Sequence, residues 1–432
     1  MIQFSHCCRV QSRDGQDRLS SAERFVRQAG ELRSTFESHA PRLLLVAAFM
    51  TISAGRARGE DVVVLLDGTV VKSRVLSIDP TGMVALADGR NVELDGLREA
   101  RRERKTSTLD FSQPKQIVEL VGGGKILAEG IQIREQRCEI SWAHGEPISL
   151  PLELLRAVRM QPKKTSPAFD AALHKPPEDF DLVFLSVNGK LQSLQGIVEG
   201  LDENSLRFEW QDKERSARRS DLHGIVLAAI GDPPDRAGQC LATLADGSSV
   251  WGKVLSLKDG KLSLRLGDDA EATLPWSAVA RLQVRSSRMV FLSEQEPVEA
   301  VHQPIVTLPR PWRRDHSVGG KALALKGRVF EKGIGVGSRS LLKFSAGREY
   351  DLFAATIGID DETKGRGDCV FVVRGDGKEL LRRRVTGQDD PREIRIDIRG
   401  VSELELIVEP GADLDLADHA DWCDARLIRE KR

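Results

Sequence analysis

The sequence is poor in aromatic residues and has almost no net charge. Its 432 residues include a single tyrosine, Tyr350, and aromatic side chains make up only 5% of the chain. The 64 Lys and Arg residues nearly balance the 65 Asp and Glu residues, so the formal charge is −1. Nucleic-acid-binding domains usually carry a clear basic excess, and so do proteins that bind membrane surfaces through polybasic segments. The composition therefore argues against both classes.

Cysteine and histidine are also scarce. Six cysteines and eight histidines are spread along the chain, and no two cysteines form a C-x-x-C pair. This argues against a zinc site of the common type and against a small disulfide-dense fold. The sequence has no H-E-x-x-H motif and no P-loop. Hydrophobic residues at 40% are enough to build cores, and the length suggests about two to four domains.

An apolar run near the amino terminus predicts export. Residues 43–54 are apolar, Arg42 precedes them, and small residues follow as far as Ala57. As a helix the run would rise about 18 Å, which is less than a bilayer requires. Charge, apolar run and small residues in this order are typical of a signal peptide. We therefore expect residues 1–58 to be a leader and signal segment, and the protein to reach the periplasm, the cell surface or the medium. An uncleaved anchor and a buried helix of a soluble domain are the alternatives.

Between residues 60 and 290 the sequence repeats a short pattern of turns and apolar runs. Asp67-Gly68 and Asp246-Gly247 precede similar apolar runs at the same spacing, and Asn188-Gly189 marks a comparable turn. A dipeptide of this kind between alternating apolar runs is a strong hairpin signal. We predict small β modules at residues 60–104, 114–162, 178–230 and 237–286.

Each module resembles an SH3-like or Sm-like small barrel at the level of pattern only. Units of this size are marginally stable alone, so we expect neighbouring modules to pair. Such barrels can bind peptides or RNA, but RNA binding needs exposed aromatic residues beside basic ones. The most basic segment, residues 215–219, is explained by a solvated turn. We expect no nucleic-acid partner and interpret the modules as a spacer or as an arm that binds envelope proteins.

The carboxy-terminal third contains several motifs in a fixed order. They are GGKAL at 319–323, KGIGVGSRS at 332–340, FAATIGIDDE at 353–362, VFVVRGDG at 370–377 and DHADWCDARL at 418–427. In this order and spacing the region at about 290–430 resembles the NPCBM family, named as a carbohydrate-binding module and related to carbohydrate-binding module family 51. We take the module to be residues 288–432.

The resemblance implies a galactose-binding-like β-sandwich of the jelly-roll type, usually appended to secreted glycosidases or to exported proteins. One position departs from the family pattern, because this chain has Gly337 where the family commonly has His in G-x-G-x-H. If that His helps to form the sugar site, binding here is weakened, altered or lost. The predicted fold class is therefore all-β, with tandem small β-barrel-like repeats followed by a jelly-roll sandwich.

A sugar site needs an aromatic face for the apolar side of a pyranose and planar polar groups for its hydroxyls. Asp418, His419, Asp421 and Trp422 supply these types within a short segment. We predict that they bind a glycan, such as a galactose-like sugar, together with Arg339. The alternatives are a core position for Trp422, a turn for Asp418, a surface position for His419, and a sheet corner or structural cation for Asp421.

A loop with three carboxylates is a candidate calcium site. Asp360, Asp361 and Glu362 follow an apolar strand, and Ca²⁺ takes about six to eight oxygen ligands. Structural Ca²⁺ is the one cofactor we consider, and a solvated acidic turn is the alternative. Cys369 and Cys423 lie beside strands of the same module, where they form either a disulfide or two buried thiols.

The sequence contains no recognisable catalytic set. A glycosidase holds two carboxylates about 5–10 Å apart in an enclosing scaffold, and residues 335–339 lack the G-x-S-x-G pattern of a nucleophile elbow. We predict an exported, non-catalytic carbohydrate-binding protein whose sandwich recognises a glycan. The alternatives are a cell-envelope scaffold that has lost sugar binding and an accessory subunit of a separate glycosidase.

Overall fold

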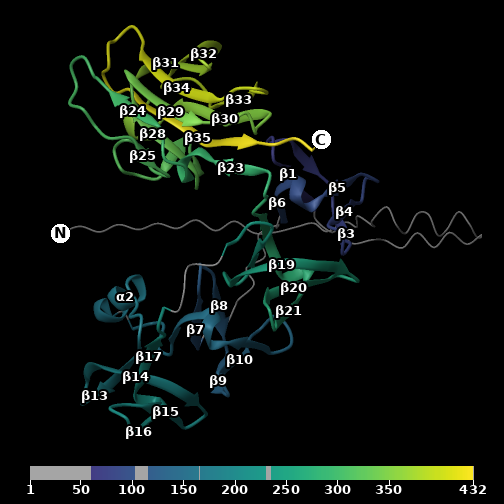
Figure 1. Cartoon of the computed structure of the whole chain (residues 1–432), viewed down its shortest axis with the longest axis vertical. Helices are drawn as coiled ribbons and strands as arrows, with labels where there is room; N and C mark the ends of the chain where they lie inside the picture. Colours follow the sequence, from purple (N-terminus) through teal and green to yellow (C-terminus); the bar gives the residue numbers. More distant parts are fainter. Residues whose placement is uncertain (1–59, 103–114, 165, 230–234, 432) are drawn as a thin grey trace, which may run out of the picture. The chain divides into compact units, whose positions relative to one another are not determined.

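The computed structural model describes residues 60–102, 115–164, 166–229 and 235–431 (Figure 1). The expected signal segment, residues 1–58, lies outside these ranges. Among the described residues no helix combines the length and the apolar character needed to cross a bilayer. Antiparallel strands dominate the described chain, so the all-β prediction is confirmed.

The repeats consist of short strands that follow one another in hairpins. Residues 60–104 contain β1 (Asp61–Leu65), β2 (Val70–Lys72), β3 (Val75–Ile78), β4 (Met83–Leu86), β5 (Asn91–Glu93) and β6 (Leu97–Arg102). Residues 114–162 contain β7 (Gln116–Leu120), β8 (Lys125–Ala128), β9 (Gly130–Arg134), β10 (Arg137–Ser141), β11 (Ile148–Pro151) and β12 (Leu155–Arg159).

The other two modules follow a short helix, α2 (Pro167–His174), which begins at the capping residue Ser166. Residues 178–230 contain β13 (Asp181–Val187), β14 (Lys190–Leu201), β15 (Ser205–Glu209), β16 (Glu214–Arg218) and β17 (Leu222–Val226). Residues 237–286 contain β18 (Cys240–Leu244), β19 (Ser249–Lys258), β20 (Lys261–Gly267), β21 (Ala270–Pro275) and β22 (Val279–Val284).

The turns form where the sequence places them. Between β1 and β2, Gly68 adopts a φ of 93°, and the Asp67 carboxylate accepts a hydrogen bond of 2.8 Å from the Thr69 N–H. A positive φ of this kind is readily adopted by glycine and costs other residues free energy. The hairpin signal therefore has a direct structural cause.

The modules pair in an order that the sequence does not reveal. The second module joins the third through β12 and β17, whereas the first joins the fourth through β6 and β22. Single residue pairs add further links, such as Leu201 with Ile133. Buried side chains from all four modules form one continuous core. The expected pairing of sequence neighbours is thus seen for the second and third modules. The first module instead pairs with the fourth, which is not its neighbour in the sequence.

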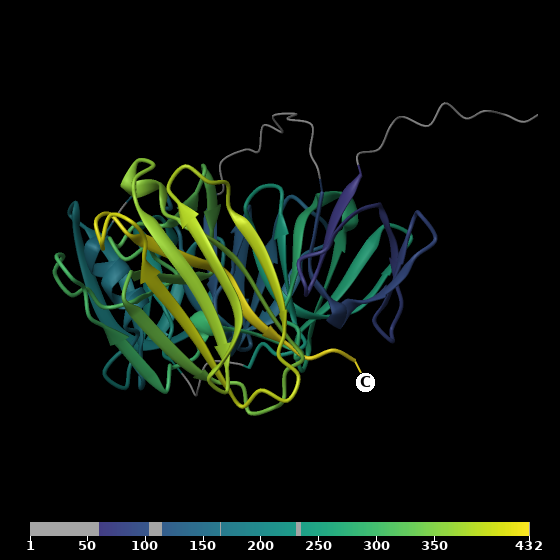
Figure 2. The same ribbon diagram turned by 90° about the horizontal axis from the view of Figure 1, so that it is seen from above.

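The carboxy-terminal region is a two-layer sandwich, whose long strands lie side by side in Figure 2. One sheet contains β23 (Met289–Phe291), β25 (Arg313–Arg314), β28 (Gly333–Gly337), β30 (Leu352–Ile359), β33 (Arg392–Asp397) and β35 (His419–Ile428). The other contains β24 (Glu299–His302), β29 (Ser340–Ser345), β31 (Asp368–Gly375), β32 (Lys378–Thr386) and β34 (Glu403–Pro410).

A separate hairpin, β26 (Leu323–Leu325) and β27 (Arg328–Phe330), contributes to a small apolar cluster with Cys423. Cys369 and Cys423 are both buried free thiols, so they do not form the disulfide that was one of two alternatives. Burial raises the pKa of both thiols well above the ordinary value. Neither is therefore a reactive thiolate at neutral pH.

The shared core of the repeats predicts a large difference between two isoleucines. Ile133 and Ile197 have the same side chain but differ in burial, because Ile133 is 1% exposed and Ile197 is 52% exposed. We expect Ile133→Ala to lower the free energy of unfolding by about 2–5 kcal/mol, because it leaves a cavity between two modules. The matched control Ile197→Ala should cost less than about 1 kcal/mol. Urea unfolding measures both, and equal losses would contradict a core shared between modules.

Candidate functional site

Most of the predicted sugar-binding residues lie on β35, a central strand of the sandwich. This strand pairs with β28 and β23 along one edge and with β30 along the other. Trp422 is fully buried, and its ring centroid lies 4.9 Å from that of Phe371 and 6.4 Å from that of Phe353. Asp421 is also fully buried. Because neither side chain has an exposed surface, neither can contact a sugar in this fold, and we correct the prediction accordingly.

Asp418 is a structural residue as well. It is buried, and its Oδ1 accepts a hydrogen bond of 2.9 Å from the backbone N–H of Asp368, the first residue of β31. Arg339 is exposed in the turn between β28 and β29, where it adopts a φ of 57° and its carbonyl accepts a bond from Gln303. The predicted residues are therefore not brought together as one site.

His419 differs from the others because it begins β35 and its side chain is 24% exposed. Its Nδ1 lies 2.6 Å from Oε1 of Glu362, and its Nε2 lies 3.3 Å from a guanidinium nitrogen of Arg310. With Nδ1 donating to the carboxylate, Nε2 is free to accept from Arg310. Burial opposes ionisation of Glu362, but hydrogen bonds from His419 and Ser317 outweigh it and lower the pKa of that carboxyl.

The three carboxylates of the predicted calcium loop bond mainly to backbone N–H groups. Asp360 caps the short 3₁₀ turn η6 (Asp361–Thr363) by accepting a bond of 2.8 Å from Glu362. Asp361 accepts bonds of 2.8 and 2.7 Å from Lys326 and Gly327, which form the turn of the β26–β27 hairpin. Within the described ranges no three His, Cys, Asp or Glu side chains are grouped to hold a metal ion. The loop therefore holds the hairpin in place, and the described residues offer no calcium site.

Asp421 and Asp360 form a buried pair of carboxyl groups. Neither oxygen of Asp421 receives a hydrogen bond from a donor group among the described residues. Burial, and next the neighbouring carboxyl of Asp360, raise the pKa of Asp421 well above its ordinary value. We expect a proton shared between the two carboxyl groups to stabilise this arrangement.

This pair predicts a pH dependence of stability. A carboxyl whose pKa is higher in the folded state binds more protons there, so stability falls as pH rises from about 4 through the folded pKa. In Asp421→Asn the amide group still donates to Asp360 but does not titrate. The free energy of unfolding of this variant should therefore fall less with rising pH than that of the wild type. Urea midpoints measured from pH 5 to 8 would show the wild type losing stability relative to Asp421→Asn as the pH rises.

The exposed Asp390 provides the control, because Asp390→Asn should leave the pH slope unchanged. The same titration with EDTA covers a bound cation. Parallel slopes for Asp421→Asn and the wild type, or a loss of wild-type stability in EDTA, would contradict the shared proton.

A cavity of about 270 Å³ opens beside the exposed end of β35. It is lined by Ala300, Val301, His302, Arg310, Pro311, Trp312, Val336, Gly337, Ser340 and Leu342. The residues come from β24, from the loop that follows it, and from β28 and β29. The cavity thus combines a tryptophan, an imidazole and a guanidinium with apolar walls.

The ring of His302 closes the loop and fills the space beside Gly337. Its Nδ1 lies 2.8 Å from the carbonyl oxygen and 3.1 Å from the backbone nitrogen of Arg310. A Cβ at position 337 would lie only 2.8 Å from His302 Nε2. Because real Cβ atoms do not approach so closely, the glycine is what allows the imidazole to stand there.

The loop after β24 is tied down by Asp415, a buried residue. Its carboxylate accepts bonds from the N–H groups of Ile305, Val306 and Thr307 at 2.9 to 3.0 Å, and from the Thr307 hydroxyl at 2.7 Å. Burial opposes ionisation, but these bonds outweigh it and hold the pKa of Asp415 well below its usual range. The loop therefore presents Arg310 and Trp312 from a fixed base.

Sequence reasoning missed His302, Arg310 and Trp312. They lie outside the motifs of the resembled family, in a proline-containing stretch without a strand pattern. The signal available was an aromatic and a basic residue on either side of Pro311 in a loop, since binding residues concentrate on loops. Of the predicted residues, His419 is the one that reaches this cavity, through Arg310.

The sequence of the sandwich matches a known family of modules. The family model described as the NPCBM/NEW2 domain matches residues 288–428. The resemblance seen in the motifs is thus confirmed, and the carboxy-terminal sandwich is an NPCBM/NEW2 domain.

A curated relative shares part of the chain. It is a protein of Renibacterium salmoninarum named "Putative endo-alpha-N-acetylgalactosaminidase", 31% identical over 110 residues. The match covers 25% of this chain and 7% of that protein, so the chain spans only a small part of its length.

Two solved structures are also similar. One is CBM51 from Clostridium perfringens GH95 in complex with methyl-galactose, with 28% identity over 32% of this chain and 99% of that chain and a TM-score of 0.30. The other is the tandem CBM51 modules of Sp3GH98, the family 98 glycoside hydrolase from Streptococcus pneumoniae, with 12% identity over 58% of this chain and 88% of that chain and a TM-score of 0.30.

Proposed function

We propose that the protein is an exported, non-catalytic carbohydrate-binding protein, and that the cavity lined by His302, Arg310 and Trp312 is its glycan site. The observation that carries the proposal is the convergence of these three side chains on one cavity of the NPCBM/NEW2 domain. Export is supported by the apolar run at residues 43–54, which resembles the core of a signal peptide.

The chemistry of the lining suits a sugar. Trp312 provides an aromatic wall for the apolar side of a pyranose, and Arg310 and His302 provide planar groups for its hydroxyls. Arg310 uses one guanidinium nitrogen on His419, which leaves other N–H donors for the ligand. The volume is slightly below the usual range for drug-sized ligands, of about 300–1,000 Å³. We therefore expect the cavity to take one terminal sugar unit of a longer glycan.

The missing family histidine is explained by the same arrangement. Where the family commonly has His, this chain has Gly337, and the imidazole of His302 lies directly beside that glycine. We infer that His302 supplies the imidazole from the neighbouring strand β24. The departure from the family pattern is then an exchange of positions for the imidazole, and sugar binding is retained.

The lining also supports a non-catalytic role. Glycoside hydrolysis uses a pair of carboxylates on either side of the scissile bond. The described residues that line the cavity include no Asp or Glu. The site is thus equipped to hold a sugar and lacks the groups that hydrolyse one.

A second candidate function is binding of an envelope protein. The loop after β24 exposes Ile305, Val306 and Leu308, the last with 81% of its surface open to solvent. Leu414 and Leu416, on either side of the tethering residue Asp415, are exposed as well. Exposed apolar residues gathered on adjacent segments are typical of contact surfaces for other proteins.

Removal of the aromatic wall tests the proposal. We expect Trp312→Ala to weaken binding of the best ligand from a glycan array at least about 10-fold, which is about 1.4 kcal/mol. The control is Trp210→Ala in the third module, where a half-buried tryptophan also lies beside an arginine. Titration calorimetry measures both variants after circular dichroism has shown that they fold. Equal affinities for the two variants would contradict the site.

A methyl group at Gly337 tests the role of His302. Gly337→Ala should displace the imidazole and weaken glycan binding severalfold, with little change in the melting temperature of the sandwich. Gly130→Ala is the control, because a Cβ there meets nothing closer than 4.0 Å. Unchanged affinity in Gly337→Ala would show that His302 does not contact the sugar.

A further inference from the structure

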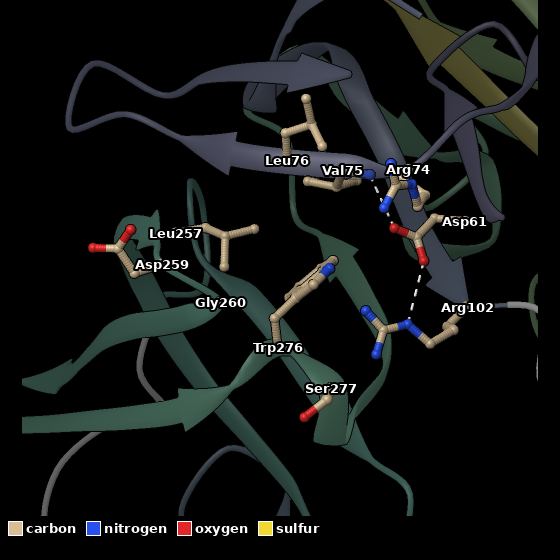
Figure 3. A pocket seen from close by; sticks show the side chains of 10 residues that line it. All are labelled: Asp61, Arg74, Val75, Leu76, Arg102, Leu257, Asp259, Gly260, Trp276 and Ser277. Atoms are coloured by element: carbon tan, nitrogen blue, oxygen red, sulfur yellow. Dashed lines mark hydrogen bonds and ion pairs between the residues drawn. The ribbon is translucent and has the colours of Figure 1, made fainter. Parts of the chain in front are cut away.

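A larger cavity, of about 610 Å³, lies in the repeats between the first and fourth modules (Figure 3). Strands β3 and β19 are joined there by a single residue pair, Ile78 with Leu257. Beyond this pair, Leu76 lies on one side and the turn at Asp259 and Gly260 lies on the other. The cavity therefore opens where two modules separate.

Trp276 is largely buried, with 9% of its surface exposed, and it lines this cavity at its centre (Figure 3). Val75, Leu76 and Leu257 provide apolar walls around it (Figure 3), and the guanidinium carbon of Arg102 is 5.8 Å from its ring centroid. The indole Nε1 is buried and has no hydrogen-bond partner among the described residues. In Figure 3 this nitrogen is on the side of the ring that faces Arg102 and Asp61. A buried donor without an acceptor costs about 1–3 kcal/mol, and because this nitrogen has no exposed surface, a ligand in the cavity contacts other atoms of the ring.

The charged groups of the cavity fall into two kinds. Asp61 is buried and fixed, because it accepts bonds from the Val75 N–H at 2.9 Å and from Arg102 at 3.3 Å. Arg74 and Asp259 are exposed, and no hydrogen bond or ion pair to another described residue engages either side chain. Figure 3 shows them at opposite sides of the cavity. Arg74 as a donor and Asp259 as an acceptor are thus available on opposite sides of Trp276.

We propose that this cavity is a second glycan site, in which a pyranose unit lies against Trp276 and its hydroxyls bond to Arg74 and Asp259. The site goes beyond the function proposed for the sandwich and gives the repeats a binding role in place of a spacer role. Two weak sites on one chain would raise the avidity for a glycan that reaches both.

The lining favours a sugar over a peptide strand. A peptide that extends a sheet needs unpaired backbone groups on the protein. Here the backbone N–H of Val75 donates to the Asp61 carboxylate, and the backbone N–H of Trp276 donates to the Gly260 carbonyl at 2.7 Å. Two arginines also balance two aspartates in the lining, which suits an uncharged ligand. Side chains that present both donors and acceptors match the hydroxyls of a neutral sugar.

The test uses the full chain with Trp312→Ala as background, so that the sandwich cavity is disabled. The probes are the methyl pyranosides of glucose, galactose, mannose, N-acetylglucosamine and N-acetylgalactosamine, followed by saturation-transfer NMR. We expect at least one to bind this background, and Arg74→Ala or Asp259→Asn to weaken that binding at least about fivefold. Asn tolerates the left-handed backbone at position 259, where φ is 51°. The exposed Lys253 provides the control, because Lys253→Ala should leave binding unchanged.

The outcomes separate the two proposals. Loss of all binding in Trp312→Ala, or residual binding that Arg74→Ala and Asp259→Asn leave unchanged, would overturn the second site. A cavity that binds members of a peptide library and none of the pyranosides would overturn it too. Wild-type binding that depends on Arg74 and Asp259, and is unaffected by Trp312→Ala, would support the second site and overturn the sandwich site. A wild type that binds no pyranoside would overturn both.

Discussion

The sandwich depends on strand β35, which is covered on both faces. Its neighbours β28 and β30 pair with it over most of its length, Trp422 fills the core between the sheets, and Cys423 packs under the β26–β27 hairpin. Near its end the buried Arg426 donates a bond of 2.7 Å to the carbonyl of Leu66 in the first module. One strand thus organises the sandwich core and bonds the sandwich to the repeats. A strand used in this way has no side chain left for a ligand except at its ends.

Binding chemistry is accordingly found where strands end or separate. The first residue of β35, His419, contacts Arg310 in the lining of the sandwich cavity. The residues that line the cavity come from β24, β28, β29 and a loop held by Asp415. In the repeats the cavity around Trp276 likewise opens beside a single residue pair that joins two modules. Both cavities lie at the ends or edges of sheets, and loops and turns form part of their lining.

Local signals in the sequence predicted a large part of the fold, and tertiary contacts decided the rest. The turn at Asp67-Gly68 and the ordered motifs of the sandwich needed no knowledge of distant residues. Trp422 was misassigned because its side chain points into the core between the sheets. Asp421 lies on the opposite face of β35, and alternation along a strand does not reveal that this outer face is covered too. The carboxylates of Asp360 and Asp361 suggested calcium, but most of the N–H groups that occupy them belong to the β26–β27 hairpin, more than 30 residues away. His302 belongs to no motif, and its role is apparent only from its position beside Gly337.

The central claim is that the sandwich recognises a glycan through the cavity beside Gly337. Amide hydrogen exchange of the full chain, with and without the best ligand from a glycan array, tests it most directly, because bound ligand slows local opening. The account predicts slower exchange in residues 299–312 and 333–342, with no change in the buried centre of β35. Exchange that is slowed elsewhere in the sandwich and unchanged in both of these segments would contradict it.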